Sequence, residues 1–340
     1  MEKEGAFLKL NTRIIGVFIC FFFSFFSCAA AQEIHLVWQP VHQGENDLTA
    51  KDKITGINVV SPSFFEISGE NGWIKDSVDE PYVKGLKEKG YAVWPLITNS
   101  FDPDLTHRIL QNETARRYVT EQLVFYIERY DLDGINLDFE NIYDEDKDAL
   151  TVFVAEISAA LHAVNKVVSI DVTVPSDTAN WSPCYDRQKL AQVTDYIILM
   201  AYDEHWRSSK TAGSVASIGW VERGIQSLVS NISPEKVILG VPFYTRLWQE
   251  VNGEVVRAST LTMPQADQLW KAKGLERRWL QDMGQYYFEY EEEGQRFRVW
   301  QEDTRSLQEK NSLVQKYKLG GIAAWRKGFE ENSVWQVLSL

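Results

Sequence analysis

Short apolar runs alternate with amphipathic segments along the chain after residue 32. Most of these runs are continuously apolar, which is typical of parallel strands that are covered on both faces. The segments between them, such as 114–130, 144–164 and 303–318, have helical periodicity, and Asn112 is placed to cap the first. The connection 39–55 is only weakly helical.

Eight strand segments that alternate with helices favour a closed parallel barrel, the (β/α)8 or TIM barrel, over an open doubly wound sheet. We therefore expect one α/β domain over residues 32–340. The predicted strands are 34–38, 56–60, 92–97, 134–140, 167–174, 196–202, 237–243 and 321–325.

One stretch interrupts this regular spacing. Between 243 and 320 the chain is far longer than a single helix requires. Residues 286–290 and 296–301 have strand character and are joined by a segment that contains Gly294, which predicts an antiparallel hairpin. We interpret this region, about 246–305, as a small antiparallel β insertion between the seventh and eighth barrel strands.

The amino terminus has the pattern of an export signal. Three basic residues precede an apolar run at 14–26, and small residues up to Ala31 follow it. This pattern predicts a signal peptide at 1–31 that is cleaved before Gln32. Two alternatives are an uncleaved anchor, because 14–31 reaches the roughly 18 residues needed to span a bilayer, and a lipoprotein acylated at Cys28. All three place the domain outside the cytoplasm, secreted or attached to the cell envelope.

Composition narrows the classes of partner. The formal net charge is -13, from 48 acidic and 35 basic residues, which disfavours nucleic acid as a partner. With the leader removed, Cys184 is the only cysteine, and the five histidines show no ligand spacing, so we expect no metal and no other cofactor. No obligate protein partner is inferred.

The strongest chemical pattern is in the segment 132–140. Side chains alternate along a strand, so Asn136, Asp138 and Glu140 share one face, whereas the positions between them are all apolar and must face the helices. The three polar groups then point into the barrel at the carboxyl end of a strand, where barrel enzymes carry their catalytic residues. Glu140 and Asp138 are therefore candidate catalytic residues.

The spacing of the two acids also bears on mechanism. Residues two apart on a strand are roughly 6.6 Å apart and point the same way, whereas an ordinary retaining or inverting pair flanks the scissile bond from opposite sides. A substrate-assisted reaction suits acids on one side. In it the 2-acetamido oxygen of the sugar attacks, Glu140 protonates the leaving oxygen, and Asp138 steadies the acetamido nitrogen. This chemistry requires an N-acetylated sugar.

The same segment resembles the Asp-x-x-Asp-x-Asp-x-Glu motif of glycoside hydrolase family 18, with matches at Asp133, Asp138 and Glu140. Asn136 replaces the middle Asp. This departure recurs in the branch similar to bacterial spore-germination and peptidoglycan N-acetylglucosaminidases, and it alters how Asp138 is charged and oriented.

Other strand ends carry the resemblance further. Residues 200–203 are similar to the family's Met-x-Tyr-Asp motif, in which the Tyr, here Tyr202, supports the acetamido oxygen. Residues 240–246 resemble Gly-x-Pro-Phe-Tyr-Gly-Arg, with Thr245 replacing Gly, and 320–325 resemble the last strand, whose Trp forms the floor of the cleaved sugar's subsite. The resemblance implies substrate binding by Asn136, Met200, Asp203, Tyr244, Arg246 and Trp325.

Three functions remain open from sequence. The segment 94–99 lacks the Ser-x-Gly-Gly of typical chitinases, which together with Asn136 favours hydrolysis of peptidoglycan over chitin. A catalytically weak glycan-binding protein is the rival from another class, but such a protein is expected to lack the acid at Glu140. His205 and Trp206 follow the sixth strand and are candidates for the rim of the cleft.

Overall fold

The computed structural model describes residues 33–40, 47–50 and 52–338, and one compact unit extends from Glu33 to the carboxyl terminus. The predicted signal peptide at 1–31 lies outside the described residues. None of the described helices combines the length and apolar character that crossing a bilayer requires.

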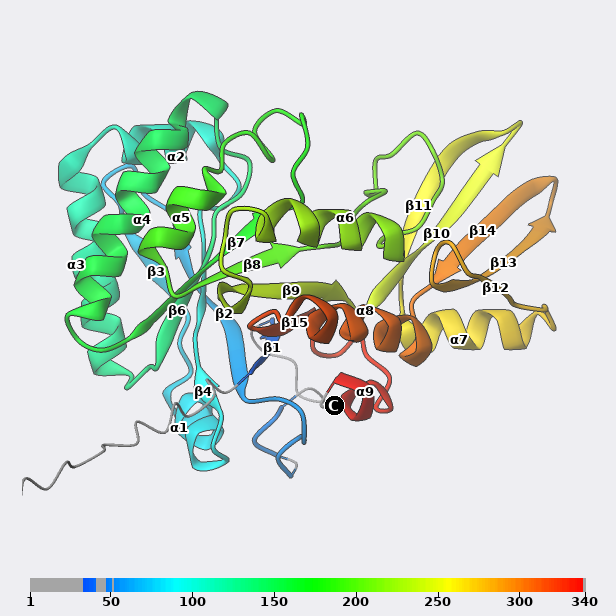
Figure 1. Cartoon of the computed structure of the whole chain (residues 1–340), viewed down its shortest axis with the longest axis horizontal. Helices are drawn as coiled ribbons and strands as arrows, with labels where there is room; N and C mark the ends of the chain where they lie inside the picture. The colour runs from blue at the N-terminus through cyan, green and yellow to red at the C-terminus, as the bar shows by residue number, and fades with distance from the viewer. Residues whose placement is uncertain (1–32, 41–46, 51, 339–340) are drawn as a thin grey trace, which may run out of the picture. The chain divides into compact units, whose positions relative to one another are not determined.

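Parallel strands close into a barrel, as predicted (Figure 1). Closure is made by β1, which pairs with β2 on one side and with β15 on the other. The eight barrel positions that the described residues form are β1 (Ile34–Gln39), β2 (Val59–Ile67), β4 (Ala92–Val93) with β5 (Leu96–Thr98), β6 (Gly134–Asp138), β7 (Val167–Thr173), β8 (Tyr196–Met200), β9 (Val237–Pro242) and β15 (Gly321–Trp325). A short strand, β3 (Ile74–Asp76), pairs antiparallel with β2.

Several strand limits differ from the prediction. The second strand begins at Val59, not at residue 56, and continues to Ile67. The third is split into β4 and β5 at Pro95, which has no backbone N–H for the ladder. Strands β6 and β8 end two residues early, so Glu140 and Tyr202 lie in the turns that follow them.

Helices follow most strands and cover the outside of the barrel (Figure 1). Asn112 caps α3 as predicted, because its side chain accepts from the backbone N–H groups of Thr114 and Ala115. The described part of the connection from β1 to β2 contains no helix, in line with its weak periodicity. The helices around the barrel are α1 (Glu80–Glu88), α2 (Pro103–Leu110), α3 (Glu113–Arg129), α4 (Lys147–His162), α5 (Arg187–Val193), α6 (Ile218–Val229), α8 (Thr304–Tyr317) and α9 (Val334–Leu338), with 3-10 turns η2 (Asp144–Asp146) and η3 (Pro234–Lys236).

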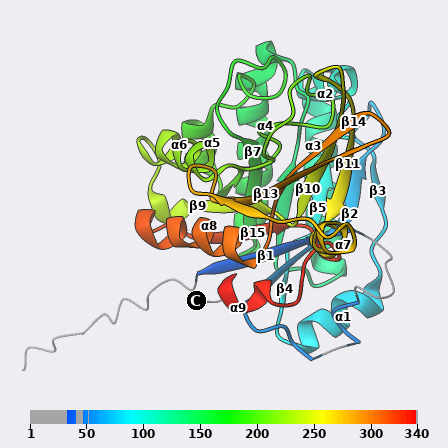
Figure 2. The same ribbon diagram turned by 90° about the vertical axis from the view of Figure 1, so that its right-hand side faces the viewer.

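An antiparallel sheet is inserted between β9 and α8, as predicted, but it is larger than one hairpin (Figure 2). The predicted hairpin is β13 with β14, and a second hairpin, β10 with β11, turns at Asn252-Gly253. Both turn residues have positive φ, which is the conformation that an Asn-Gly turn adopts. The inserted elements are β10 (Tyr244–Val251), β11 (Glu254–Thr262), α7 (Met263–Ala272), β12 (Arg278–Leu280), β13 (Gln285–Glu292) and β14 (Gln295–Gln301).

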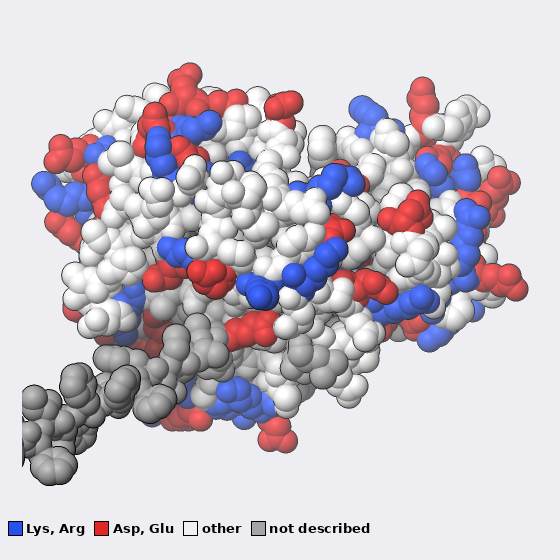
Figure 3. All heavy atoms as spheres, viewed as in Figure 1, with Lys and Arg blue, Asp and Glu red and all other residues white. Residues whose placement is uncertain are grey.

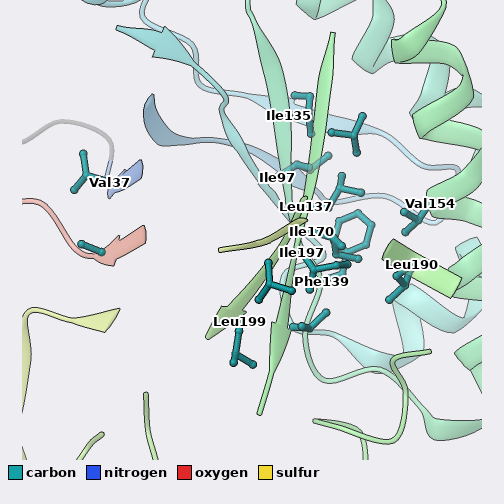
Figure 4. Packing of buried hydrophobic residues seen from close by; sticks show 14 of the residues in the cluster. Val37, Ile97, Ile135, Leu137, Phe139, Val154, Ile170, Leu190, Ile197 and Leu199 are labelled. Atoms are coloured by element: carbon teal, nitrogen blue, oxygen red, sulfur yellow. The ribbon is translucent and has the colours of Figure 1, made fainter. Parts of the chain in front are cut away.

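The alternation predicted for β6 is present in the core. Ile135, Leu137 and Phe139 belong to the apolar layer between strands and helices, where Figure 4 shows them near Val154 and Leu190. The ring of Phe139 stacks on Phe153 of α4, with centroids 6.0 Å apart. Because the apolar face of β6 packs against the helices, its polar face points into the barrel.

Candidate active site

A cleft of about 720 Å³ opens at the carboxyl ends of the barrel strands. Its lining includes residues that end strands on opposite sides of the barrel, such as Trp38 of β1, Asp138 of β6, Met200 of β8 and Trp325 of β15. Figure 3 shows acidic and basic side chains interspersed over one outer face. The cleft lies at the barrel mouth, where barrel enzymes have their active sites, and five carboxylates are among its lining residues.

Glu140 is held at the end of β6 by its own backbone. The Glu140 N–H donates to Asn99 Oδ1 at 3.0 Å, and Asn99 Nδ2 donates to the Glu140 carbonyl at 2.8 Å. Asn99 follows β5 and also donates to Thr106 of α2. This double contact fixes the turn and leaves the Glu140 side chain in the cleft. The sequence analysis did not identify Asn99 as a site residue, because an Asn after a strand is also a common loop residue.

Asn136 lies behind the cleft, and a second acid lies beside it. Trp38 Nε1 donates to Asn136 Oδ1 at 2.7 Å, and Asn136 Nδ2 donates to Asp171 Oδ1 at 2.8 Å. Asn136 is fully buried and does not line the cleft, whereas Asp171 does. The predicted contact of Asn136 with substrate stays a prediction, and the geometry supports a positioning role.

Asp171 of β7 is a site residue that sequence reasoning missed. It stands in the run Val167–Thr173, which attracted notice only as a buried strand. A carboxylate in such a run was the available signal, because a buried charge is costly unless it has a role or a partner.

Burial governs the ionisation of these acids. It raises the pKa of Asp138 to about 7. Burial also holds the pKa of Glu140 well above its usual range, and the negative charges of Asp138 and Asp203 raise it further. A raised pKa suits Glu140 to the role of proton donor.

Tyr202 and Met200 both line the cleft, as their shared strand face predicted. The Tyr202 ring packs edge-on against Trp38, with centroids 6.5 Å apart, and against Tyr244 at 6.4 Å. Burial, followed by the charge of Asp171, raises the pKa of Tyr202 well above its usual value. The phenol therefore stays neutral and is able to donate a hydrogen bond. Trp325 lies against Trp38, with ring centroids 5.8 Å apart.

Asp203, Tyr244 and Arg246 form one hydrogen-bonded group. The Tyr244 hydroxyl donates to Asp203 Oδ1 at 2.6 Å, and Arg246 Nη2 is 2.8 Å from the same oxygen. Asp203 and Tyr244 line the cleft, but Arg246 is buried behind them. Direct contact of Arg246 with substrate stays a prediction, and its observed contact is with Asp203.

Exposed aromatic side chains border the cleft. Trp206 is 51% exposed and lines the cleft, as the sequence suggested. His205 is not part of the lining, because its ring is turned toward Gly213 and contacts the Ser214 carbonyl at 2.9 Å. Further aromatic lining residues that the sequence analysis missed are Phe101, Trp181 and Trp220. Exposed aromatic faces at a polar cleft are suited to stacking on the apolar faces of sugar rings.

A metal centre is not apparent in the part of the chain that the structure describes. No group of three or more His, Cys, Asp and Glu side chains there is arranged to hold a metal ion.

Comparison with known proteins identifies the family of this barrel. The family model of the glycosyl hydrolases family 18 matches residues 38–329. The chain belongs to glycoside hydrolase family 18. The uncharacterized glycosylase YvbX of Bacillus subtilis (strain 168) is 30% identical over 301 residues, which cover 84% of each chain. As a family 18 member the protein is a glycoside hydrolase that acts on a carbohydrate.

A second relative supports the spore-germination branch of family 18, and a solved structure confirms the fold. The cortical fragment-lytic enzyme of Bacillus anthracis is 25% identical over 280 residues, covering 79% of this chain and 64% of that enzyme. The crystal structure of a chitinase from Chromobacterium violaceum ATCC 12472 superposes with a TM-score of 0.82 at 23% identity, covering 90% of this chain and 98% of that chain. At that identity the likeness shows the fold alone.

Proposed function

We propose that the protein hydrolyses β-linked N-acetylglucosamine in peptidoglycan or a related glycan by a retaining, substrate-assisted reaction. Glu140 acts first as acid and then as base. Asp138 accepts a hydrogen bond from the acetamido N–H, and Tyr202 donates to the acetamido oxygen. The sugar's own acetamido group is then the nucleophile, and its positioning supplies the rate advantage of an intramolecular reaction.

The observation that carries this proposal is the set of hydrogen-bond partners of the carboxylates in the cleft. Asp203 is bound by Tyr244 and Arg246. Both oxygens of Glu204 accept from Ser217, one from its backbone N–H at 2.8 Å and one from its hydroxyl at 3.0 Å. The remaining acids lie together on β6, β7 and the turn after β6, on one wall. Asp203 and Glu204 are thus held by protein donors, which supports a route in which the substrate supplies the nucleophile that an ordinary retaining pair takes from the protein.

The stereochemical and chemical outcomes test this route directly. We expect the β-anomer as the first product, no cleavage of de-N-acetylated glycan, and inhibition by a thiazoline mimic of the cyclic intermediate. Proton NMR during the first turnovers measures the anomer. Initial release of the α-anomer, or rapid hydrolysis of a glucosamine polymer without acetyl groups, would refute the mechanism.

The glycan is proposed to be peptidoglycan. Asn136 and the missing Ser-x-Gly-Gly support this, as does the likeness to a cortical fragment-lytic enzyme. Chitin is the second candidate, and one observation favours it: among the described residues, no Lys or Arg lines the cleft, although five carboxylates do. Such a cleft favours uncharged substituents near the scissile bond, because a negatively charged group on the glycan would find no cation to bind.

The deciding experiment digests purified peptidoglycan and N-acetylated chitooligosaccharides side by side, with mass analysis of the released ends. Glu140→Gln protein is the control for contaminating activity. Reducing N-acetylglucosamine ends from peptidoglycan, with slower release from chitooligosaccharides, are expected. Faster release of ends from chitooligosaccharides than from peptidoglycan would make chitin the proposed substrate. Binding of either glycan without turnover by the wild type would favour the glycan-binding alternative.

We also propose that the barrel works outside the cytoplasm, because the pattern at 14–31 is that of a signal peptide. Amino-terminal sequencing of secreted protein is expected to start at Gln32. A start at Met1 would favour the anchor, and an acylated Cys28 at the new terminus would favour the lipoprotein.

A further inference from the structure

Asp171 is a buried carboxylate to which the proposed reaction gives no role. It is 1% exposed, yet it reaches the cleft lining beside Asp138 and Glu140. Within the described residues, no basic side chain forms an ion pair with any of these three acids, and Asn136 donates a hydrogen bond to Asp171. Burying several ionised acids together without a cation costs free energy. We therefore expect at least one of the three to be protonated.

The strand register places Asp171 next to Asp138. Asn136 pairs with Ser169, and Leu137 pairs with Ile170. The next position on each strand therefore brings Asp138 opposite Asp171. Neighbouring strands are about 4.8 Å apart and opposed residues point to the same face, so these two carboxyl groups lie side by side inside the barrel.

The orientation of the Asn136 amide is fixed by Trp38. An indole N–H can only donate, so the atom that faces it must be Oδ1, and Nδ2 must face Asp171. An Asp at position 136, as in the family motif, has no N–H to donate to Asp171. Asn136 and Asp171 therefore form a hydrogen-bonded pair, in which β7 carries an acid beside the Asn of β6.

Hydrogen bonding by Asn136 and Trp38 favours a negative charge on Asp171, but burial and the neighbouring acids disfavour it more strongly. Asp138 and Glu140 face it from β6 and the turn after it, and Tyr202 faces it from the turn after β8. Burial, followed by the charge of Asp138, holds the pKa of Asp171 well above its usual range. Asp138 Oδ1, by contrast, is buried with no hydrogen-bond partner among the described residues. It is available for a donor on the substrate.

We propose that Asp171 is a positioning residue that stays protonated and donates a hydrogen bond to Asp138, which keeps Asp138 ionised and its Oδ1 available to the acetamido N–H. This role rests on the proposed function. It explains why an Asn at position 136 is compatible with catalysis: the neighbouring strand supplies the acid that position 136 lacks.

Two substitutions at Asp171 distinguish a role as hydrogen-bond donor from a role as negative charge. In Asp171→Asn, Asn136 still donates to the new side-chain oxygen, which directs the new N–H group toward Asp138. Asp171→Ala removes the donor. We expect Asp171→Asn to keep kcat within about tenfold of the wild type, whereas Asp171→Ala loses about 100-fold, the scale of a lost catalytic hydrogen bond. Ser169→Ala, which removes another contact of Asn136, is the control and is expected to keep the wild-type pH profile.

The pH profile gives a readout that a structural role would not move. Without the donor, the charged form of Asp138 is less favoured, so its pKa rises and the acidic limb of kcat/KM moves up by about one pH unit in Asp171→Ala. Wild-type kcat and pH profile in Asp171→Ala would overturn the proposal. Asp171→Asn as inactive as Asp171→Ala would show that Asp171 acts as a charge, which also overturns it.

A measurement without substrate separates this proposal from the proposed function. In protein labelled with ¹³C at the Asp carboxyl groups, the Asp171 resonance is identified by its loss in Asp171→Asn. We expect it to keep the chemical shift of a protonated acid at about pH 7, far above the ordinary pKa of about 3.9. Titration near that ordinary value would overturn the proposal even if the wild type cleaved N-acetylated glycans. A protonated Asp171 in a protein without that activity would leave only the proposed function in error.

Discussion

Arg246 of the inserted sheet forms an ion pair with Asp203, which follows barrel strand β8, with 2.8 Å between Arg246 Nη2 and Asp203 Oδ1. Tyr244 donates to the same oxygen at 2.6 Å. The insertion is therefore anchored on a residue of the cleft wall. The pair also moderates a negative charge that raises the pKa of Glu140.

Asp203→Asn and Arg246→Met are expected to shift the pH profile in opposite directions. Glu140 must be protonated to act as an acid, so kcat falls as pH rises through its pKa. Asp203→Asn removes a like charge, which lowers that pKa and moves the alkaline limb to lower pH. Arg246→Met leaves the Asp203 charge uncompensated and moves the limb to higher pH. Kinetics across pH on both variants check this, and shifts of the same sign would contradict the electrostatic assignment.

Glu140→Gln is expected to reduce kcat by about 10²- to 10⁴-fold, the usual contribution of a positioned proton donor. The substitution keeps the backbone contacts with Asn99, so the melting temperature and glycan binding should change little. Turnover assays beside a binding isotherm measure the two effects separately. A variant with near wild-type turnover would remove Glu140 from the mechanism.

Asp138→Asn is expected to slow the reaction strongly, by about 100-fold or more, because the developing positive charge on the acetamido nitrogen loses its anionic partner. Asn136→Asp is expected to have a milder effect, since Asn136 lies behind the cleft and orients other groups. Steady-state kinetics of the two variants on one N-acetylated substrate decide the order. The opposite ranking would place the essential interaction at position 136.

Lys310→Met is expected to lower the free energy of unfolding by about 3–5 kcal/mol, because it leaves the Glu302 carboxylate buried without its cation. Both side chains are fully buried, with 3.0 Å between Lys310 Nζ and Glu302 Oε2. Lys316→Met is the matched control. It breaks the pair with Glu222, in which the lysine side chain is 60% exposed, and should lower the free energy of unfolding far less, because water screens the pair. Urea unfolding curves measure both, and equal losses would contradict the argument from burial.

The strand pattern was predictable where burial dictates residue type. Parallel barrel strands have apolar neighbours on both faces, so apolar runs, most of them continuous, marked the eight positions. The alternation in β6 showed which of its residues face the helices. The first and last residues of the strands were less predictable, because hydrogen bonds to the neighbouring strand decide where each strand begins and ends. Val59, not residue 56, begins β2 because it pairs with Leu36 of β1.

The inserted sheet was only partly predictable. The hairpin β13–β14 carries an apolar pattern with a Gly turn, whereas the exposed strand β11 has little apolar character. The Asn252-Gly253 turn was the signal that would have located its hairpin. Strand β10 also pairs with β14, which lies about fifty residues further along the chain. The local sequence does not indicate a pairing over that distance.

The sequence by itself determined the barrel, the placement of Asp138 and Glu140 at the carboxyl end of a barrel strand, and the family whose motif they carry. It did so because strand periodicity and burial act locally along the chain. Only the tertiary structure placed Asp171 opposite Asp138 and Arg246 behind Asp203. It also brought Trp38 to Asn136, where its indole N–H orients the amide. Each of these contacts joins residues from different strands, and the register and closure of the barrel decide which side chains meet.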